Sequence, residues 1–553
     1  MFADTVRTRA SSSRGSIDWE LITTAVLLGA VMMIGLVTAP HFGTTVDEFN
    51  ADPYGRQALA WYLSGFSDDA LFRNAEVIHL YGPWFQIITA LVQSVASTDP
   101  LTVRHALTFV IGLLGIAALG PIARLTIGRG AGLVAIGLCL ITGYVYGHLF
   151  FSPIDVPFLA AMTWATLAII VMTRRAIPSW RSTVITGLAL GLALGTRPGG
   201  VVAQAYLAGA MALSALEIII TSNQATVGAA LGKLALRTGA AIGIAWLFAV
   251  AIWPWLQIGS PFTQFWNAFT FFNHMDLSFN FMHWGREIST AELPWHYILG
   301  QLAARLPEPF LALLLLSLAL GMVQTVHFFA DIRRRLATEG PAGLRSSLLP
   351  LASNRGVLVI AVAALAPILM IIALDSTIYD GIRHILFVIP MLALVASWSL
   401  VRLVPQPSKI SIAVAAATGI YLCASIATLV ALHPLQYVAM NSFAGGTKGA
   451  YSRFELDYWS AAATVAIRRL EQRLDRNPIA QRPKVMVCIG WREPMVAPMF
   501  RRDWEVTTNQ DEADFLIETE RSSCAADTNS VLIDEVVRAG RSFARTYAIQ
   551  GKA

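Results

Sequence analysis

The feature that most constrains this chain is a series of eleven long apolar runs separated by polar segments or by glycine and proline. A helix needs roughly 20 mainly apolar residues to cross the hydrocarbon core of a bilayer. The run at 183–196 is shorter than the others, and Pro198, Gly199 and Gly200 separate it tightly from the next. The runs predict spans near 21–40, 106–124, 131–150, 157–173, 183–196, 200–220, 238–257, 308–330, 356–374, 385–403 and 410–432.

Composition agrees with these runs. The 553 residues are 55% hydrophobic and only 14% charged, which is outside the range of ordinary globular domains and favours a polytopic membrane protein. The net charge of +5 is explained more simply by basic loops on one membrane face than by a nucleic-acid partner. Four cysteines in so long a chain do not form a disulfide scaffold.

Residues 1–18 contain three arginines and many serines, so we expect a short disordered tail. The run that follows is too long for a signal-peptide core and lacks a small-residue cleavage site. We therefore expect a retained first span whose N-terminus is cytoplasmic.

The segment 82–95 decides the topology, because it could cross the membrane or lie in the interface as an amphipathic helix. If it does not cross, the basic loops share one side with the basic N-terminus, as the positive-inside rule favours. We therefore predict an interfacial helix and an extracytoplasmic C-terminus. The basic loops contain Arg124, Arg129, Arg174, Arg175, Arg181, Lys233, Arg237, Arg333, Arg334, Arg335 and Lys409.

With this topology, the unusual residues gather on the outer side. The membrane domain, 19–432, has long outer loops at 41–105 and 258–307 and short outer turns at 151–157, 197–200 and 375–384. Such one-sided sorting is what an active site facing one aqueous compartment would produce.

The character of the chain changes after residue 432. Charge density rises, 458–476 shows helical periodicity, and the apolar stretches at 484–489 and 514–517 have the length of strands. We expect residues 433–553 to form a periplasmic α/β domain. Cys488 and Cys524 lie in it, either joined by a disulfide or as two free thiols.

Asp47 and Glu48 follow the first span directly. Charges beside membrane segments are costly to hold, so they suggest function, and a carboxylate within hydrogen-bond reach can take the proton of an acceptor hydroxyl. The alternatives for Asp47 are a cap of a helix starting near Pro53 or a solvated position at the interface. Asp52, directly before Pro53, is the more obvious cap.

Together with this acidic pair, several further stretches resemble the outer loops of GT-C glycosyltransferases, in particular the protein O-mannosyltransferase-like and lipid A aminoarabinose transferase-like family. The resemblance covers about 40–460 and implies a GT-C fold, a polyprenyl-phosphate-linked sugar donor, inversion at the anomeric carbon and no nucleotide-sugar site. It also implies that the protein lies in the inner membrane of a bacterium. The stretches are His79–Pro83, Phe151–Pro157, Glu292–Tyr297, Tyr379–His384 and Arg453–Trp459.

Asp155 lies between two prolines, directly before a span. It is either a helix cap or, as the resemblance implies, a second acid that orients the acceptor or the sugar. Arg383 offers a fixed, bidentate clamp for a phosphate leaving group. It could instead snorkel to the interface or pair with Asp380, three residues earlier. His384 is expected to be a helper or a structural hydrogen-bond donor rather than a base.

Four other residues complete the candidate site. Arg197 is an outer cation in a tight glycine-containing turn, where the backbone can approach a ligand or simply form a helical hairpin. His79 and Tyr81 would line the rim where the lipid carrier meets the interfacial helix, and Tyr379 lies beside Arg383. The aromatic residues of 258–307 indicate an interfacial belt, a prenyl or sugar groove, or both.

No P-loop, metal-ligand cluster or Ser-His-Asp pattern is present in the sequence. His274, Asp276, His283 and His296 share one loop, but their spacing matches no metal site. We therefore expect no cofactor, although a divalent cation is conceivable beside several outer acids.

The hypothesis is an inverting glycosyltransferase that moves a sugar from a polyprenyl-phosphate carrier to an acceptor hydroxyl, with Asp47 as general base and Glu48 and Asp155 positioning the substrates. The acceptor is a glycan, a lipid or a protein. One rival is a transporter or flippase of lipid-linked sugars, which would need broken or charged helices at midmembrane depth. The other is a non-catalytic envelope scaffold.

Overall fold

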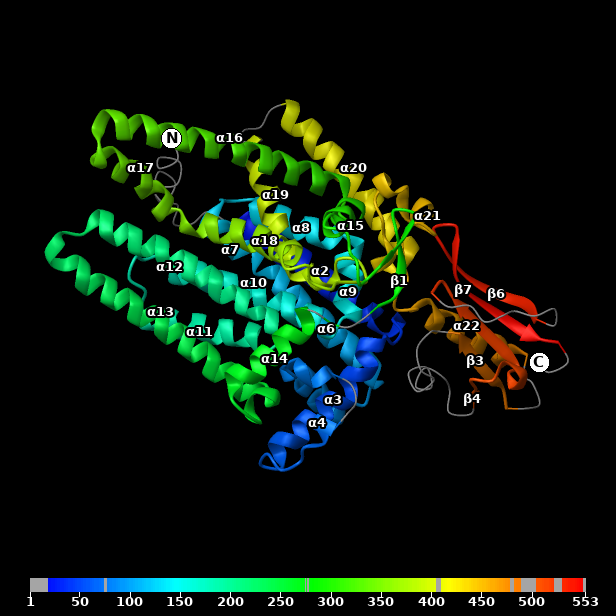
Figure 1. Cartoon of the computed structure of the whole chain (residues 1–553). Coiled ribbons are helices and arrows are strands. Elements are labelled where there is room, and N and C mark those ends of the chain that lie inside the picture. Colours follow the sequence, from blue (N-terminus) through cyan, green and yellow to red (C-terminus); the bar gives the residue numbers. More distant parts are fainter. Residues whose placement is uncertain are drawn as a thin grey trace.

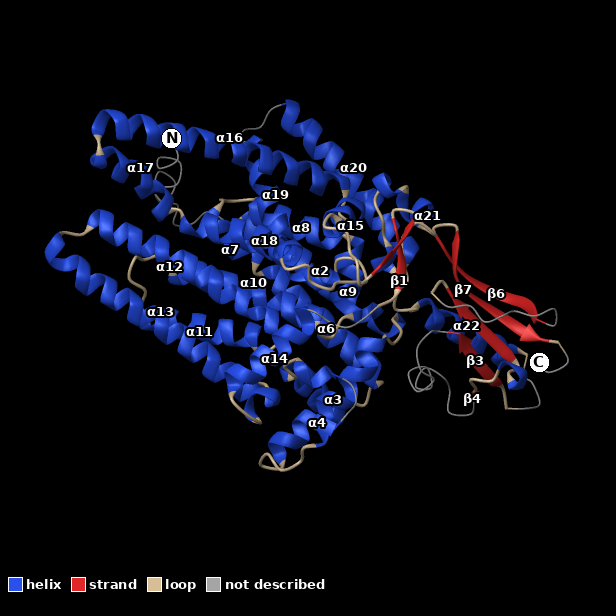
Figure 2. Cartoon of the chain, in the orientation of Figure 1, coloured by secondary structure: helices blue, strands red, loops and turns tan. Residues whose placement is uncertain are grey.

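The computed structural model describes residues 18–73, 77–273, 275, 278–403, 409–477, 482–488, 504–521 and 530–550. A bundle of helices forms its body, and a small domain with a sheet lies at one end (Figures 1 and 2). The predicted tail before Asp18 lies outside the described residues, as do His274, Asp276 and Cys524.

All eleven predicted spans coincide with helices. Among the described residues, eight helices are long and apolar enough to cross a membrane, a ninth span is a bent pair, and the apolar parts of α11 and α20 are shorter. The predicted polytopic helical architecture is therefore confirmed. The helices are α2 (Trp19–Thr38), α6 (Pro100–Ala117), α7 (Leu119–Thr126), α8 (Ala131–Ile141), α9 (Gly143–Phe151), α10 (Asp155–Met172), α11 (Trp180–Leu194), α12 (Val202–Thr221), α13 (Gln224–Ile252), α16 (Glu308–Glu339), α18 (Arg355–Ala373), α19 (Ile389–Leu403) and α20 (Lys409–Leu432).

The helix α10 is the centre of the bundle. Of its residues only Trp164 and Val171 are not buried, as expected for a helix that is apolar on every side. It packs against α6, α11, α12, α18 and the 3₁₀ helix η5 (Arg383–Val388). This packing brings the N-terminus of α10, with Asp155, close to Arg383.

The bent pair joins the bundle to the segment that follows the last span. The helices α8 and α9 meet at an angle of 73° beside Thr142. Glycines on α9 let η6 (Gln436–Val438) approach its backbone, since a Cβ on Gly147 would lie 2.4 Å from the amide nitrogen of Tyr437.

The first outer loop contains η1 (Ala39–His41), α3 (Val46–Leu63), α4 (Ala70–Arg73), η2 (Val77–Leu80) and α5 (Trp84–Val95). The predicted helix α5 is present. Its 12 residues reach about 18 Å, less than a hydrocarbon core of about 30 Å, which agrees with the predicted interfacial position; that position stays a prediction.

The helix expected to start near Pro53 instead begins at Val46, with Pro53 inside it. Thr45 and Glu48 form a capping box there, because each side chain accepts a hydrogen bond from the backbone N–H of the other, at 3.3 and 3.0 Å. Asp52 pairs with Arg104 of α6 rather than capping the helix.

The second long outer loop contains η4 (Pro254–Gln257), α14 (Pro261–Asn273), an antiparallel hairpin of β1 (Asn280–His283) and β2 (Arg286–Ser289), and α15 (Tyr297–Arg305). Trp284 and Gly285 turn the hairpin with φ values of 52° and 76°, the backbone that a two-residue hairpin loop requires. The remaining elements of the bundle are η3 (Pro198–Val201) and α17 (Pro341–Ser353).

Charged residues lie at both ends of the bundle. The turns joining α12 to α13 and α16 to α17 lie at the end away from the C-terminal domain (Figure 1). Beside the start of α2, Arg124 of α7 binds Asp18 at 2.8 Å and Glu20 at 3.1 Å. The structure thus separates these basic residues from the outer loops as expected, and the compartment that each end faces stays a prediction.

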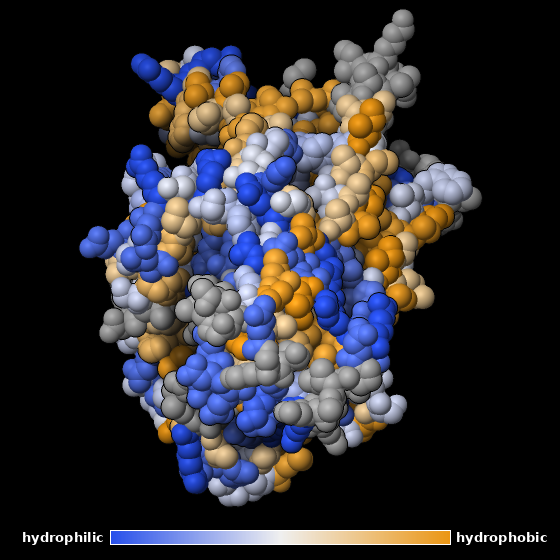
Figure 3. All heavy atoms as spheres, turned by 90° about the vertical axis from the view of Figure 1, so that its right-hand side faces the viewer, coloured by the Kyte–Doolittle hydropathy of each residue, from blue (hydrophilic) through white to orange (hydrophobic). Residues whose placement is uncertain are grey.

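The C-terminal domain has a mixed sheet in the order β4-β3-β5-β7-β6, in which β3 runs parallel to β4 and β5 while β7 is antiparallel to β5 and β6. Figure 3 looks onto this end, where hydrophilic side chains cover much of the surface between hydrophobic patches. The predicted α/β character is confirmed. Its elements are η7 (Ser442–Ala444), α21 (Gly446–Ala450), α22 (Ala462–Arg476), β3 (Lys484–Cys488), β4 (Glu505–Val506), η10 (Gln510–Glu512), β5 (Phe515–Thr519), β6 (Ser530–Arg538) and β7 (Arg541–Ile549).

Of the cysteines, Cys488 is disulfide-bonded, whereas Cys139 and Cys423 are free. The suggested partner, Cys524, lies outside the described residues, so that pairing stays a prediction. Cys139 and Cys423 both lie in apolar runs, which predicts core positions; Cys139 is buried as predicted, whereas Cys423 is exposed, so the prediction is wrong for Cys423.

Candidate active site

Asp47 lies in the first turn of α3, at the end of the bundle that carries the C-terminal domain. The capping box of Thr45 and Glu48 fixes where this helix starts. The unpaired N–H groups of a first turn favour negative charge, so the local fold holds a carboxylate here. The side chain of Asp47 is 19% exposed and remains partly accessible.

Arg383 is the cation that meets Asp47. Its Nη1 donates to Oδ2 of Asp47 at 2.7 Å, and its Nε lies 3.1 Å from Oδ2 of Asp380. The guanidinium stands 4.8 Å from the ring centre of Tyr379. The local ion pair between Arg383 and Asp380 that the sequence left open is therefore present, but it is shared with Asp47, 336 residues away in sequence.

The loop before Arg383 has an unusual backbone. Asp380 has φ of +58°, a left-handed conformation that side-chain-bearing residues rarely adopt, and Gly381 has φ of +73°. The hydroxyl of Tyr144 donates to the carbonyl of Asp380 at 2.7 Å, and the amide of Gly381 donates to the hydroxyl of Tyr297 at 3.2 Å. Tyrosines of α9 and α15 therefore hold the loop that presents Arg383.

Asp155 and Arg197 form the second part of the cluster. They are directly paired, and the hydroxyl of Ser152 donates to Oδ2 of Asp155 at 2.9 Å. The same Oδ2 lies 3.9 Å from Nη1 of Arg383. One ionic cluster, which we call the outer cluster, thus joins Asp47, Asp155, Arg197, Asp380 and Arg383.

The outer cluster changes the acidity of Asp47. Loss of solvation raises the pKa of Asp47 to about 6, while the nearby Arg383 guanidinium opposes the rise and the carboxylates of Asp155 and Asp380 add to it. Burial also raises the pKa of Asp380. A carboxylate with a pKa near 6 is ionised at neutral pH and is a stronger base than an ordinary aspartate.

Glu48 has the contacts of a structural residue. One oxygen accepts from the amide and hydroxyl of Thr45 at 3.0 and 3.1 Å, and the other lies 2.9 Å from Nε2 of His105. It is buried, and within the described part of the chain its hydrogen bonds and ion pair involve Thr45 and His105 rather than Arg383 or Asp155. The predicted role of Glu48 in positioning substrates stays a prediction.

The rim residues lie on one side of the outer cluster. Tyr81 stacks on Phe272 of α14 at 4.3 Å, and the Arg197 guanidinium lies 5.4 Å from its ring centre. His79 packs against Trp255 at 5.0 Å. Tyr81 therefore contacts the outer cluster through Arg197, whereas His79 contacts the aromatic ring of Trp255.

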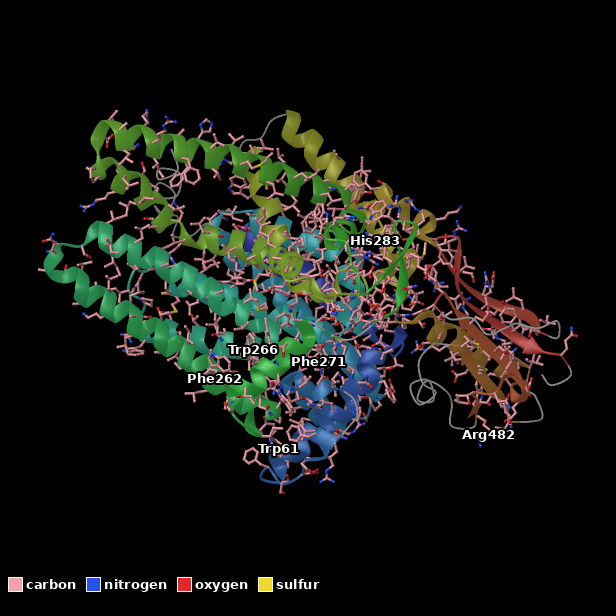
Figure 4. All side chains as sticks on the ribbon, viewed as in Figure 1. Trp61, Phe262, Trp266, Phe271, His283 and Arg482 are labelled. Carbon is pink, nitrogen blue, oxygen red and sulfur yellow. The ribbon has the colours of Figure 1, made fainter. Side chains whose placement is uncertain are left out.

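The remaining predicted residues surround Arg383. The ring of His384 meets that of Tyr379 at 4.8 Å, edge to face, which suits a structural role. Along the neighbouring helix α14, Figure 4 marks Phe262, Trp266 and Phe271. Phe262 and Trp266 are 67% and 60% exposed, as expected for the predicted aromatic belt.

Sequence reasoning missed the contribution of the C-terminal domain. Arg521, which follows β5, lies 3.8 Å from Asp380 and 3.1 Å from Glu455, and Trp459 lies 6.0 Å from the Arg383 guanidinium. The acidic and aromatic stretch 453–459 signalled Glu455 and Trp459. No local pattern around Arg521 connects it to the site.

Within the part of the chain that the structure describes, no three or more His, Cys, Asp or Glu side chains are grouped to hold a metal ion. Independence of a metal or cofactor remains an expectation. A cavity of about 10 Å³, lined in part by Tyr81, Gln86 and Thr196, has room for about one water molecule. A sugar phosphate therefore needs more space than this cavity provides.

Comparison of the sequence with protein families and with curated proteins gave no match. Among solved structures, ArnT from Cupriavidus metallidurans in the apo state is 14% identical with a TM-score of 0.46, covering 95% of this chain and 98% of that one. The same protein bound to undecaprenyl phosphate is 13% identical, with a TM-score of 0.44 and coverage of 97% and 99%.

The archaeal oligosaccharyltransferase AglB from Archaeoglobus fulgidus, in complex with an inhibitory peptide and a dolichol-phosphate, is 12% identical with a TM-score of 0.41, covering 91% of this chain and 69% of that one. At these values the likeness assigns neither a substrate nor the role of any residue.

Proposed function

We propose that this protein is an inverting glycosyltransferase that uses a sugar linked to a polyprenyl phosphate. The observation that carries the proposal is the outer cluster, in which the acids and cations of four outer segments meet at one end of the bundle. An acid able to act as a base and a cation able to bind a phosphate are in direct contact there.

In the proposed reaction, Asp47 takes the proton of the acceptor hydroxyl, and the hydroxyl oxygen attacks the anomeric carbon of the sugar. The bond between that carbon and the phosphate oxygen breaks on the opposite face. The bonding electrons pass to the polyprenyl phosphate, whose added charge is stabilised by Arg383 and supported by Arg197. Asp155 holds Arg197 and orients the sugar or the acceptor.

The contact between Asp47 and Arg383 gives this reaction an order. A donor phosphate competes with Asp47 for the guanidinium, because a phosphate can accept two parallel hydrogen bonds from an arginine. Binding of the donor therefore releases Asp47 from its ion pair and leaves it free to accept a proton. The base becomes available when the leaving group is in place.

The test uses the purified protein in liposomes with radiolabelled undecaprenyl-phosphate sugars and an envelope extract as the source of acceptors. Asp47→Asn should lower transfer by about 10²–10⁴-fold, the usual contribution of a general base. It should still bind undecaprenyl phosphate, since Arg383 is retained.

Asp68→Asn is the matched control, because Asp68 is an exposed acid in the same outer loop, where its carboxylate accepts from the amide of Ala70 at 3.1 Å. It should transfer at the wild-type rate. Full activity of Asp47→Asn would remove Asp47 from the mechanism. If the wild-type protein translocates the lipid-linked sugar without transferring it, the protein is a flippase. If it does neither, the protein is a scaffold.

A further inference from the structure

Arg521 lies where the C-terminal domain meets the membrane domain. It follows β5, and its side chain is 17% exposed. Its Nη1 donates to the carbonyl of Tyr458 at 2.5 Å, its Nε lies 3.1 Å from Oε1 of Glu455, and its guanidinium lies 5.3 Å from the ring centre of Phe279. These contacts, with the 453–459 segment and with Phe279 of the second long outer loop, hold the Arg521 side chain against the membrane domain.

The charge opposite Arg521 is Asp380. One oxygen of Asp380 lies 3.8 Å from Nη1 of Arg521, and the other lies 3.1 Å from Nε of Arg383. Arg383 continues to Asp47 at 2.7 Å. Charges of alternating sign therefore run from Glu455 through Arg521, Asp380 and Arg383 to Asp47, from the C-terminal domain to the proposed base.

Apart from Arg521, few contacts hold the Asp380 side chain in place. Its backbone is in the left-handed region, so the loop depends on contacts from its surroundings. Tyr144 donates to its backbone carbonyl, and Tyr297 accepts from the amide of the next residue, Gly381. Among the described residues, only the two arginines pair with the Asp380 carboxylate. Without Arg521, the carboxylates of buried Asp380 and half-buried Glu455 would lose the cation that lies between them.

We propose that Arg521 is a positioning residue, which holds Asp380 against Arg383 and thereby sets the orientation of the phosphate-binding guanidinium. The C-terminal domain then completes the catalytic site of the membrane domain. This inference rests on the proposed function, and it goes beyond that proposal by giving the C-terminal domain a part in the reaction.

A purely structural role for Arg521 has different consequences. Its bond to the carbonyl of Tyr458 and its contact with Phe279 could simply anchor the domain. Loss of an anchor would lower stability or activity by a similar factor at every pH. Loss of positioning through a charge would instead depend on pH, because a carboxylate without its cation binds a proton more readily.

Charged groups from several segments influence the ionisation of Asp380 and Glu455. Asp380 is influenced by Arg383 of η5, Arg521 of the C-terminal domain, Asp155 of α10 and Arg305 of α15. Glu455 is influenced by the same Arg521 and Arg305 and by Asp380 and Asp457, and burial raises its pKa to about 7. Removing Arg521 takes away a positive charge that favours the ionised form of both carboxylates.

The experiment compares the full-length wild-type protein with Arg521→Gln, Glu455→Gln, the double variant and Arg521→Lys. Arg521→Gln should lower transfer about tenfold at pH 6.5, a loss in the range of couplings between neighbouring charged groups. Activity should recover as the pH rises, because the acidic limb of its profile moves upward when Asp380 is protonated more readily.

The double variant decides between positioning and anchoring. With Arg521 removed, Glu455 and Asp380 are two carboxylates that repel each other. Glu455→Gln removes the negative charge that then favours protonation of Asp380, so the double variant should recover transfer to within about threefold of the wild type. Arg521→Lys keeps the charge and should keep the wild-type profile. An unchanged profile for Arg521→Gln, or a double variant no better than it, would overturn the inference.

Two further measurements keep the outcomes separate. Thermal melting of each variant identifies misfolding, and if Arg521→Gln does not fold, the double variant is judged against Glu455→Gln alone. Binding of undecaprenyl phosphate by the same proteins reads the position of Arg383 without transfer and should weaken in Arg521→Gln. A wild type without transfer would refute the proposed function, whereas equal undecaprenyl phosphate binding by all the variants would refute the positioning role.

Discussion

The two ends of the helical bundle carry ionic clusters built from the same residue types but with opposite properties. At the end where α2 begins, Arg124 is 33% exposed and Arg129 is 71% exposed, and hydrogen bonds from Arg124 lower the pKa of Asp18. At the other end, Arg383 is 10% exposed and burial raises the pKa of Asp47 to about 6.

The difference distinguishes ion pairs that hold helices together from ion pairs in which a ligand can replace one of the partners. An exposed pair with favourable hydrogen bonds gains little from any new partner. A buried carboxylate whose pKa is raised is held in a state that its surroundings disfavour, so a ligand that changes its partner can change its behaviour. Perturbed acids of this second kind are typical of active sites.

The largest expected effect is that of Arg383→Gln. It should abolish binding of undecaprenyl phosphate and lower transfer by about 10³-fold, because the developing charge of the leaving group loses its cation. Equilibrium binding in nanodiscs and the transfer assay measure the two losses. Retained binding would place the phosphate elsewhere and remove the distinction between the two clusters.

The second effect is a dependence on pH that belongs only to the outer cluster. Transfer should rise about tenfold per unit of pH below pH 6 and level off above it, because Asp47 must be ionised to act as a base. Folding stability should respond in the opposite direction. Since the folded-state pKa lies above that of the unfolded chain, the stabilising contribution of protonated Asp47 is present below about pH 4 and is lost as the pH rises through 6.

Rate profiles of the wild type between pH 4.5 and 8, with denaturant unfolding at the same pH values, check both signs. In the Asp47→Asn variant, the free energy of unfolding should no longer show the change between about pH 4 and pH 6 that titration of Asp47 causes in the wild type. A rate limb far from pH 6 would show that another group controls the reaction.

The smallest effect is expected at the opposite end. Arg124→Gln breaks the exposed pairs with Asp18 and Glu20 and should leave transfer unchanged within about twofold. The melting temperature should fall slightly at low salt and match the wild type at high salt, since salt screens exposed charges. A large loss of transfer would mean that the two ends of the bundle are coupled.

Much of this architecture is predictable from the sequence because the membrane constrains it strongly. Eleven apolar runs became helices, and the length of α5 and the bias of basic loops predicted that it does not span. The meeting of Asp47, Asp155, Arg197 and Arg383 was also expected, since all four lie in segments assigned to one side. Sidedness alone was enough to place them in one region.

Contacts that depend on tertiary packing were not predictable. The start of α3 was misplaced because the weight given to Asp52 and Pro53 hid the capping box of Thr45 and Glu48. Arg521 could not be linked to Asp380, because they lie in different domains and no periodicity connects them. The hairpin β1–β2 was missed because its turn, Trp284-Gly285, lies in a stretch interpreted by its aromatic content.

The close approach of η6 to α9 has a consequence for how such a protein can change. The glycines of α9 let the chain leading to the C-terminal domain rest on the same helix whose Tyr144 binds the loop before Arg383, and Tyr144 also accepts a hydrogen bond from Tyr458 at 3.0 Å. Replacing the C-terminal domain alone would therefore leave α9 and the 375–384 loop without their matching surface. Any functional chimera would have to exchange all three segments together.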